Sequence, residues 1–213
     1  MKRNIFTLAV LFIAGMAFAQ SSNQSRAILD KAFNAYEKSR GILLDFNITT
    51  SEANGTAYQP QTGKARIKGN KFKLEMDAMD TWFDGKTQWV LMKDANEVNI
   101  SNPTSTEIAS LSPLALLGMY KTGFTLKYPV SKMVNGKSAF VIDMIPDGKS
   151  DFKQLSVAID KKTNAVLQVK TLMSNDTKST IDISSYNPYN YFSEAVFVFN
   201  KAAHPGVEIV DLR

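Results

Sequence analysis

The chain contains no cysteine and only one histidine. Without cysteine it can form no disulfide, no thiolate metal site and no catalytic thiol. The histidine, His204, precedes Pro205 and Gly206, a setting typical of a surface loop rather than of a catalytic base. Glycine-rich phosphate loops and nucleophile elbows are missing as well. The sequence therefore predicts a protein that is not an enzyme and that binds no metal or cofactor.

Charge of either sign is not concentrated anywhere along the chain. The whole chain has 25 Lys and Arg against 20 Asp and Glu, a formal net charge of +5. Without Lys2 and Arg3, which belong to the N-terminal segment described next, the net charge is +3. Such a mild excess without basic runs gives no case for nucleic acid, although it is compatible with weak attraction to anionic lipid surfaces.

Long hydrophobic runs are confined to the N-terminus. A basic pair precedes the apolar stretch Ile5 to Met16, which is too short to span a bilayer, and Ala17-Phe18-Ala19 forms a small-x-small cleavage signal. Residues 1–19 are thus predicted to be a cleavable signal peptide, with an uncleaved anchor as the alternative. The next residue, Gln20, excludes lipidation on an N-terminal cysteine. We expect an exported, soluble protein of one domain, residues 20–213.

The mature chain opens with helical periodicity. One apolar stripe recurs at a spacing of about 3.6 residues and consists of Ile28, Leu29, Ala32, Phe33 and Tyr36. The pattern predicts a helix from Ser25 to Arg40. Gly41 follows at the position where a C-terminal cap belongs.

Alternation of apolar and polar residues takes over after Gly41. It predicts six consecutive strands joined by short turns, namely Leu44 to Thr49, Ala65 to Lys68, Phe72 to Met76, the two arms of a hairpin around Asp84-Gly85, and Val98 to Ile100. Consecutive strands with short connections favour a meander in which each strand pairs with the next.

The hairpin around Asp84-Gly85 is the strongest local signal, because glycine adopts a positive φ at no steric cost. Trp82, Phe83 and Trp89 lie close to this turn. Their rings are either ordinary core residues or the lining of a surface for an apolar ligand. The turn can hold two or three residues at its tip, and this choice sets the pairing register and decides which rings share a face.

The strand pattern is interrupted between Pro103 and Gly123. Thr106 to Leu111 is compatible with a short helical turn. Ser112-Pro113 then provides an N-cap followed by proline at the first helical position, and residues 114–119 are nearly all apolar. One face of this helix can pack on the sheet while a second needs another partner, so the helix is either fully buried or a lid over a cavity.

Strand patterns resume after Gly123. They cover Phe124 to Val130, Ala139 to Ile145, Leu155 to Ile159, Val166 to Met173, Thr180 to Ser184, Val196 to Phe199 and Val207 to Val210, with an aromatic loop from Tyr186 to Tyr191. The prediction for the whole chain is mainly β (α+β), with about eleven strands. A meander of that length must curl or close to hide its edges.

Methionine and aspartate raise two functional alternatives. Six methionines of the mature chain lie in predicted strands or strand ends, namely Met76, Met79, Met92, Met133, Met144 and Met173, and a seventh, Met119, lies in the predicted apolar helix. Methionine suits surfaces that fit variable apolar partners, although it also fills ordinary cores. Asp77, Asp80 and Asp84 cluster as in a hydrolase or a calcium site, but turn chemistry explains all three.

Several ordered blocks of the sequence resemble one known family. They are Leu44-Asp45-Phe46, the strand Gly63 to Lys68 followed by Gly69-Asn70-Lys71-Phe72, the hairpin Asp84-Gly85-Lys86-Thr87-Gln88-Trp89, Ser112-Pro113-Leu114-Ala115-Leu116-Leu117, Phe152-Lys153-Gln154-Leu155, Ala195-Val196-Phe197-Val198-Phe199, and Gly206-Val207-Glu208-Ile209-Val210-Asp211. Behind a cleavable signal, their order and spacing resemble the periplasmic outer-membrane lipoprotein carriers of the LolA family.

This resemblance implies an open, curled antiparallel half-barrel whose concave face is covered by the N-terminal helix and the central apolar helix. It implies a periplasmic, monomeric carrier that shields lipoprotein acyl chains between an inner-membrane extracting transporter and an outer-membrane receptor or the membrane itself. We expect the acyl-chain cavity to be lined by Phe46, Ile48, Phe72, Leu74, Met76, Trp82, Trp89, Leu91, Leu114, Leu117, Phe140, Ile142 and Met144.

One position departs from the family pattern. The family commonly has an Arg-Pro pair before the Phe72 position, and that arginine helps to hold the closed lid. Here Lys68-Gly69 stands in its place, and lysine cannot make the same forked contacts, although Arg66 lies on the same strand face and can substitute. A lipid-binding or envelope-sensing module of the same fold is therefore the alternative to a lipoprotein carrier.

Overall fold

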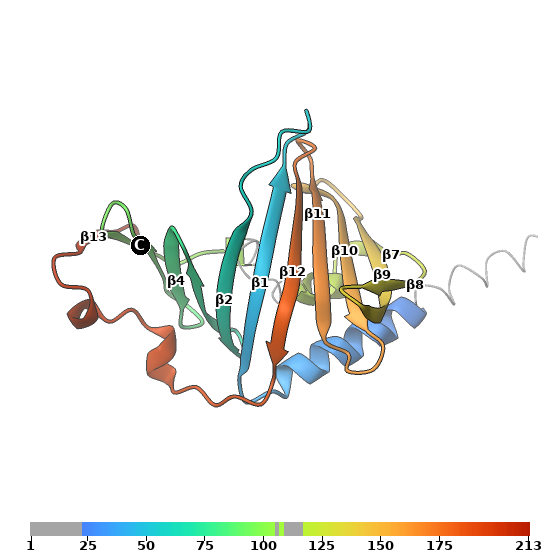
Figure 1. Ribbon diagram of the computed structural model, residues 1–213, viewed down its shortest axis with the longest axis horizontal. Helices are drawn as coiled ribbons and strands as arrows, with labels where there is room; N and C mark the ends of the chain where they lie inside the picture. The colour runs from blue at the N-terminus through green and yellow to red at the C-terminus, as the bar shows by residue number, and fades with distance from the viewer. Residues whose placement is uncertain (1–22, 105–106, 109–116) are drawn as a thin grey trace, which may run out of the picture.

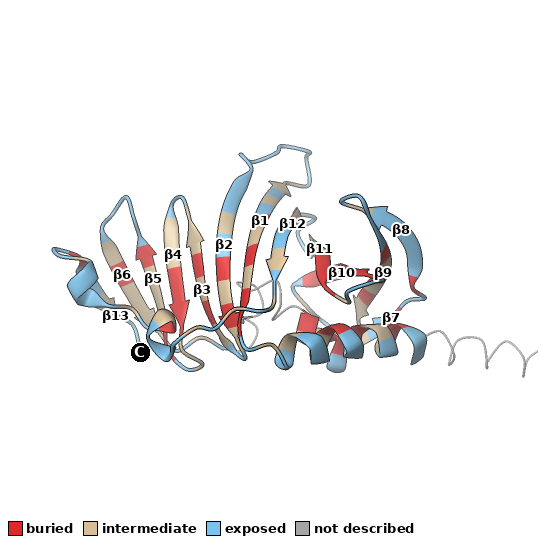
Figure 2. Cartoon of the chain, turned by 60° about the horizontal axis from the view of Figure 1, so that its bottom comes forward, coloured by how far each residue is buried: buried red, intermediate tan, exposed pale blue. Residues whose placement is uncertain are grey.

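The computed structural model describes residues 23–104, 107–108 and 117–213 (Figure 1). The strands of these residues form one thirteen-stranded sheet, in the order β13-β6-β5-β4-β3-β2-β1-β12-β11-β10-β9-β7, with β8 also pairing with β9. Residues 23–37 form a helix that lies alongside β9 to β12 (Figure 2). We call the face of the sheet that this helix covers the concave face, and the opposite face the convex face.

The sheet is built from two meanders joined in its middle. The first contains β1 (Ile42–Ser51), β2 (Gln61–Lys68), β3 (Lys71–Met76), β4 (Met79–Phe83), β5 (Gln88–Met92) and β6 (Glu97–Ser101). The second contains β9 (Lys137–Pro146), β10 (Phe152–Asp160), β11 (Val166–Met173) and β12 (Lys178–Asn187). Antiparallel pairing of β12 with β1 joins them. The predicted meander of the first six strands is confirmed.

The edges of the sheet differ from the sequence prediction. One edge carries β7 (Phe124–Leu126) and β8 (Val130–Val134), which pair with successive parts of β9 and replace the single strand expected from Phe124 to Val130. At the other edge β13 (Glu208–Asp211) pairs with β6 in parallel, so the sheet is not wholly antiparallel. The described residues thus form thirteen strands rather than about eleven.

The strand predicted from Val196 to Phe199 is wrong. The chain there forms the short 3₁₀ helix η2 (Glu194–Phe197) and then crosses the convex face. Apolar residues at four successive positions do not fix a face, and Phe197 is fully buried without pairing to a neighbouring strand. A second 3₁₀ helix, η3 (Lys201–Ala203), precedes β13.

The N-terminal helix is shorter than predicted and ends without a glycine cap. It stops at residue 37, and the Ser39 hydroxyl donates to the Tyr36 carbonyl at 2.7 Å. Gly41 instead forms a bridge to Tyr189. A Cβ at Gly41 would lie 2.8 Å from the Phe192 ring and 2.9 Å from the Asn190 carbonyl oxygen, so close packing rather than a positive φ requires glycine there.

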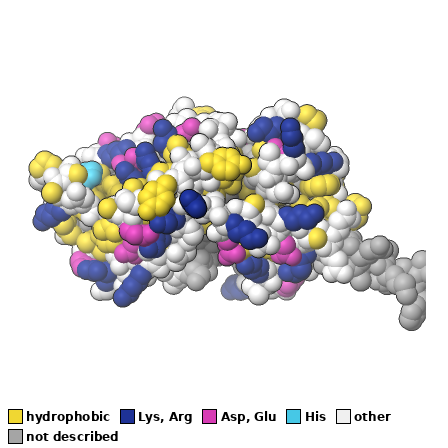
Figure 3. All heavy atoms as spheres, turned by 90° about the horizontal axis from the view of Figure 1, so that it is seen from below, with side chains coloured by type: hydrophobic (Ala, Val, Ile, Leu, Met, Phe, Trp, Pro, Cys, Tyr) yellow, Lys and Arg dark blue, Asp and Glu magenta, His cyan; other side chains and the backbone are white. Residues whose placement is uncertain are grey.

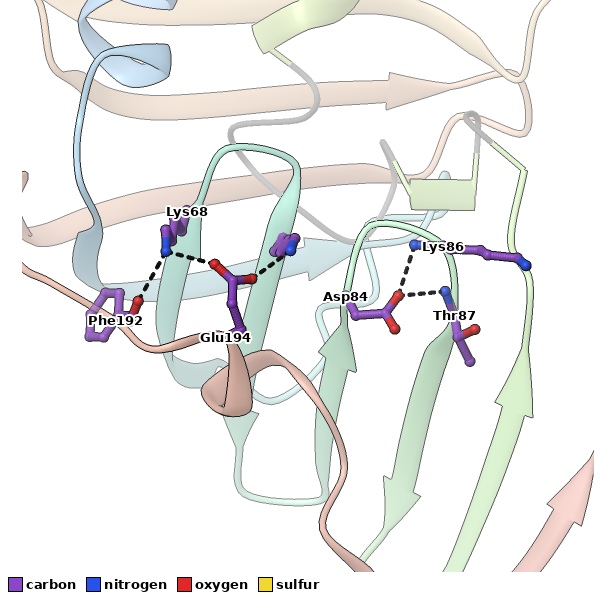
Figure 4. Close-up of polar contacts among 7 residues, drawn as sticks. Lys68, Asp84, Lys86, Thr87, Phe192 and Glu194 are labelled. Carbon is purple, nitrogen blue, oxygen red and sulfur yellow. Dashed lines mark hydrogen bonds and ion pairs between the residues drawn. The ribbon is translucent and has the colours of Figure 1, made fainter.

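The Asp84-Gly85 hairpin joins β4 to β5 as predicted. Asp84 N–H donates to the Thr87 carbonyl at 3.2 Å, and the Asp84 carboxylate accepts from the N–H groups of Lys86 and Thr87 at 2.9 and 2.8 Å (Figure 4). Gly85 has a φ of 101°. The resulting register pairs Trp82 with Trp89 and places Phe83 on the opposite face.

Most of the predicted central segment lies outside the described residues. This applies to Ser112-Pro113, to Leu114 and to most of the short turn from Thr106 to Leu111. Leu117 and Gly118 are helical, and η1 (Met119–Lys121) follows them as a 3₁₀ helix.

Candidate functional site

The concave face carries one continuous apolar cluster, which we call the concave core. Phe83, Phe72, Ile67 and Ile42 form one row across β4, β3, β2 and β1. Val169, Val157 and Ile142 form another across β11, β10 and β9. Strand pairing aligns these side chains because alternate residues of each strand point to the same face. The apolar surface therefore extends across both meanders.

Among the described residues, the N-terminal helix and the segment just before β7 cover much of the concave core. Leu29 and Ala32 of the N-terminal helix are buried against it, as the apolar stripe predicted. Residues 117–121, which we call the covering segment, contribute the buried residues Leu117 and Tyr120. The central part of the concave core is therefore shielded from water in this structure.

The covering segment is attached to the helix rather than only to the sheet. The Tyr120 hydroxyl donates to the Asp30 carboxylate. The Phe33 ring meets the Tyr120 ring edge to face at 6.2 Å, and the Lys121 ammonium lies 3.5 Å from the Phe33 ring centroid. Burial and the neighbouring Asp30 carboxylate raise the pKa of Tyr120, so this hydroxyl stays a donor at physiological pH.

The helix is also attached to the sheet at its C-terminal end. The Tyr36 hydroxyl donates to the Gly69 carbonyl in the turn between β2 and β3. Burial raises the pKa of Tyr36 to about 12, and that of Tyr186 to about 12 as well. At the other end of the helix the Ser25 hydroxyl donates to the Lys127 carbonyl at 2.5 Å.

Apolar side chains of the concave core reach solvent at its margin. Members packed against the core but only partly buried include Ile48, Met76, Met173 and Ile181. Met79 pairs with Met92, which is exposed, on the same face of β4 and β5 as Phe83. Met76, Met79 and Met92 of the neighbouring strands β3, β4 and β5 thus adjoin one another at this margin. Flexible, polarisable thioethers at the margin of an apolar surface suit ligands of variable shape.

A cleft of about 450 Å³ opens beside the covering segment. Its apolar wall includes Met119, Phe124 and Phe152, all of which belong to the concave core or pack against it. Lys149 and Asp151 form part of its polar rim. An apolar wall with a few polar groups at the rim, within this range of volume, is typical of small-molecule sites.

The structure separates the thirteen predicted cavity residues into groups. Eight belong to the concave core or pack against it: Phe46, Ile48, Phe72, Leu74, Met76, Leu117, Ile142 and Met144. Phe140 lies on the same face of β9, partly buried, with the Lys161 ammonium 4.6 Å from its ring centroid. Leu114 lies outside the described residues.

The other three, Trp82, Trp89 and Leu91, lie on the convex face. They pack with Val98, Ile100, Phe199 and Val207 in a second cluster, which we call the convex core. The register explains the division, because β4 is buried on both faces and its residues alternate between the two cores. Trp82, Trp89 and Leu91 therefore do not share a surface with Phe72 and Leu74, and the prediction that they do is wrong.

Lys68 and Arg66 also face away from the concave core, since Ala65 and Ile67 of the same strand point into it. Lys68 Nζ donates to the Phe192 carbonyl at 3.2 Å and to the Glu194 carboxylate at 2.7 Å (Figure 4). Arg66 forms an ion pair with Glu75. Both cations therefore stabilise the convex side, and Lys68 holds the C-terminal segment rather than the covering segment.

Asp80, Asp84 and His204, which were considered for catalysis from the sequence, make structural contacts. Asp84 accepts hydrogen bonds within its turn, and Asp80 pairs with Lys93 at 2.9 Å. His204 stacks on the Phe199 ring at 5.0 Å in the convex core. Within the part of the chain that the structure describes, no group of three or more acidic or histidine side chains could hold a metal ion.

Several residues of the site were not singled out from the sequence. Tyr120, Leu155 and Val157 are central to the concave core. The alternation of apolar residues could have identified Leu155 and Val157, because these two residues share one face of a predicted strand. No local pattern could have identified the role of Tyr120, because its contact with Asp30 joins residues ninety positions apart.

An open, curled sheet wrapped around an apolar concave core and covered by helical segments defines a class of half-barrel folds. Residues 15–171 match the family of outer membrane lipoprotein carrier protein LolA, and the chain belongs to this family. No curated protein matches the chain. None of the helices among the described residues has the length and hydrophobicity needed to cross a membrane.

Solved structures agree with this fold. An uncharacterized conserved protein from Thermus thermophilus is similar with a TM-score of 0.57 and 12% identity, over 88% of this chain and 99% of that one. The lipoprotein LppX of Mycobacterium tuberculosis is similar with a TM-score of 0.50 and 14% identity, over 81% of this chain and 100% of that one. At these identities the likeness shows the fold alone.

Proposed function

We propose that this protein is a periplasmic carrier that holds the acyl chains of lipoproteins against its concave core and transfers them from the inner to the outer membrane. The observation that supports the proposal most is the apolar concave surface, which continues past its cover to the partly buried margin of Ile48, Met76 and Met173. Membership of a family described as lipoprotein carriers supports the cargo class. We propose no catalytic role and no cofactor.

The physical task explains the need for such a surface. Each CH₂ group removed from water contributes about 0.8 kcal/mol, so exposed acyl chains are costly in an aqueous compartment. The concave core offers a shared apolar environment, and ligand would replace the contacts of the covering segment. Release becomes possible because those contacts can form again when the ligand leaves.

A second candidate is a lipid-binding or envelope-sensing module with another ligand. The position of Lys68 favours it, because this residue contacts Phe192 and Glu194 instead of the cover of the concave core. The two candidates differ in cargo rather than in the surface that binds it. Mass spectrometry of lipids and lipoproteins that copurify with the protein from the cell envelope separates them.

Uptake of a fluorescent triacylated lipopeptide by the purified protein tests the proposed site. Met76→Asp puts a charge at the margin of the concave core, and we expect uptake to fall at least tenfold. Met133→Asp is the matched control, because Met133 is 68% exposed on β8 at the edge of the sheet. Equal uptake by both variants, or no uptake by the unaltered protein, would rule out this site.

The proposal includes export and processing. Residues 1–19 act as a signal peptide, and residues 20–213 act as one monomeric carrier domain with an inner-membrane transporter and an outer-membrane receptor or membrane as partners. Sequencing the N-terminus of the protein isolated from the envelope tests the first part. We expect it to begin at Gln20.

A further inference from the structure

The turns that join neighbouring antiparallel strands differ in charge between the two ends of the sheet. At the end where the helix leads into β1, the lower end in Figure 1, the connections comprise residues 38–41, 69–70, 84–87, 135–136, 161–165 and 188–193. They hold five cations and one carboxylate: Lys38, Arg40, Lys86, Lys161, Lys162 and Asp84. The strands themselves run antiparallel, so this assignment follows from the pairing register.

The upper end has the reverse balance. Its connections comprise residues 52–60, 77–78, 93–96, 147–151 and 174–177. They hold six carboxylates and two lysines: Glu52, Asp77, Asp94, Asp147, Asp151, Asp176, Lys93 and Lys149. Charges immediately flanking the connections cancel at each end: Lys68, Lys71 and Lys137 against Glu37, Asp160 and Glu194 below, and Lys178 against Glu97 above. Among these connections the balance of charge thus differs in sign between the two ends, and Lys121 and Lys201, which precede β7 and β13, lie outside this comparison.

The lower end also presents two aromatic rings to water. Tyr189 is 92% exposed and Tyr191 is 78% exposed, the two highest values among the large hydrophobic side chains that the structure describes. Figure 3, which views this end, shows hydrophobic side chains interspersed with Lys and Arg and also with several Asp and Glu side chains. Tyrosine with an apolar ring and a polar tip is the side chain enriched where membranes meet water.

The backbone holds these rings outward. Tyr189 N–H donates to the Asn187 side-chain oxygen at 3.0 Å, and the Asn190 side chain donates to the Asn187 carbonyl at 2.9 Å. Asn190 N–H donates to the Gly41 carbonyl at 3.0 Å, which fixes the loop to the start of β1. The exposure of the rings is therefore built into the loop.

Cations and rings lie together at this end. A cleft of about 560 Å³ between the helix terminus and the loop is lined by Lys38, Arg40 and Tyr189, among others. Neither Lys38 nor Arg40 forms an ion pair among the described residues. Both side chains are exposed and remain able to pair with an external anion.

We propose that the lower end of the molecule docks on the surface of an anionic lipid bilayer, with Tyr189 and Tyr191 inserted at the interface and Lys38 and Arg40 among the headgroups. A bilayer fits better than a protein partner because the cations are spread over several turns and because Tyr189 and Tyr191 are both largely exposed to solvent. This surface is separate from the concave core, and its binding requires no cargo.

Vesicle cosedimentation of the purified protein without lipopeptide tests the proposal. We expect binding to vesicles of equal parts phosphatidylcholine and phosphatidylglycerol, little binding to phosphatidylcholine alone, and loss of most binding at high salt, where surface charges are screened. Equal binding to both vesicles would overturn the proposal.

A pair of charge-reversal variants tests the location. Each Lys or Arg near an anionic surface contributes about fivefold to binding, so Lys38→Glu with Arg40→Glu should weaken it by at least tenfold. Lys170→Glu with Lys178→Glu makes the same change in net charge with exposed residues outside the lower end. An equal loss in this control would show that net charge alone acts, and would overturn docking through the lower end.

The rings are tested in the same assay. Tyr189→Ser with Tyr191→Ser should lower binding several-fold, and this part of the loss should persist at high salt because it is not electrostatic. Tyr58→Ser with Tyr128→Ser removes two exposed tyrosines located elsewhere and should leave binding unchanged. Unaltered circular dichroism and lipopeptide uptake show that each variant is folded and keep this test independent of the carrier proposal.

Discussion

Gly63 illustrates how single residues shape the concave core. It lies in the middle of β2 opposite Phe46, and a Cβ there would approach the Phe46 ring to 2.4 Å. Phe46 is itself buried, so its ring has little room to move. The absence of a side chain at Gly63 thus provides the space that the ring fills.

Gly63→Ala should therefore destabilise the protein by about 1–3 kcal/mol, as overpacking of a core does. The free energy of unfolding from urea titration measures this. Gly148→Ala is the control, because nothing lies within 4 Å of a Cβ at Gly148, and it should change stability by less than about 0.5 kcal/mol. A Gly63→Ala protein as stable as the control would contradict the packing described.

The ion pairs of Glu194 should make the stability of the folded protein depend on pH in the acidic range. Hydrogen bonds from Lys68 and Lys71 lower the pKa of Glu194 from 4.5 to about 2. A carboxylate with a depressed folded-state pKa stabilises the protein above its unfolded pKa, and this contribution is lost as the pH falls from about 4.5 to about 2. Midpoints of urea unfolding should show that Glu194→Gln is less stable than the unaltered protein at neutral pH. This difference in stability should shrink as the pH approaches about 2. Glu208→Gln, at an exposed position, should match the unaltered protein throughout.

At the scale of elements, the N-terminal helix is the organising piece of the concave side. It contacts the sheet through Leu29 and Ala32, the turn between β2 and β3 through Tyr36, and the covering segment through Asp30 and Phe33. Any ligand that displaces the covering segment must break the contacts with Asp30 and Phe33 while those with the sheet remain. In the proposed function, the helix would therefore be the fixed wall from which ligand displaces the covering segment.

Tyr36 links this helix to alkaline stability. Burial raises its pKa to about 12 in the folded state, whereas in the unfolded chain it ionises near 10. The neutral hydroxyl thus favours the folded state below pH 10, and that contribution disappears as the pH rises from about 10 to about 12. Tyr36→Phe should show a shallower loss of thermal stability over this range than the unaltered protein, while exposed Tyr128→Phe should not.

The sequence predicted elements better than their faces. Alternation located the first six strands, and the helical stripe located Leu29 and Ala32 in the core. It could not assign Trp82 and Phe83 to faces, because both are aromatic and β4 is buried on both sides. The parallel pairing of β13 depends on a contact with β6 more than a hundred residues away, which no local pattern carries.

At the scale of the whole molecule, the sheet separates the concave core from the convex core, and these two cores have different covers. The concave core lies beneath the helix and the covering segment, whereas the convex core lies beneath Phe199, Val207 and the C-terminal segment. The convex side is held by Lys68, Lys71 and Glu194 and by the parallel strand β13. We infer that the convex core stabilises the fold, while the concave core both stabilises it and receives ligand.

Leu74 and Leu91 test this division as a matched pair. They are 5% and 6% exposed, and they point to the concave and the convex core respectively. Leu→Ala in either core should cost about 2–5 kcal/mol, so both variants should lose similar stability in urea. Lipopeptide affinity should change only in Leu74→Ala, because only that residue lies on the surface proposed to hold acyl chains. Comparable changes in affinity in both variants would mean that lost stability, rather than the concave surface, controls binding.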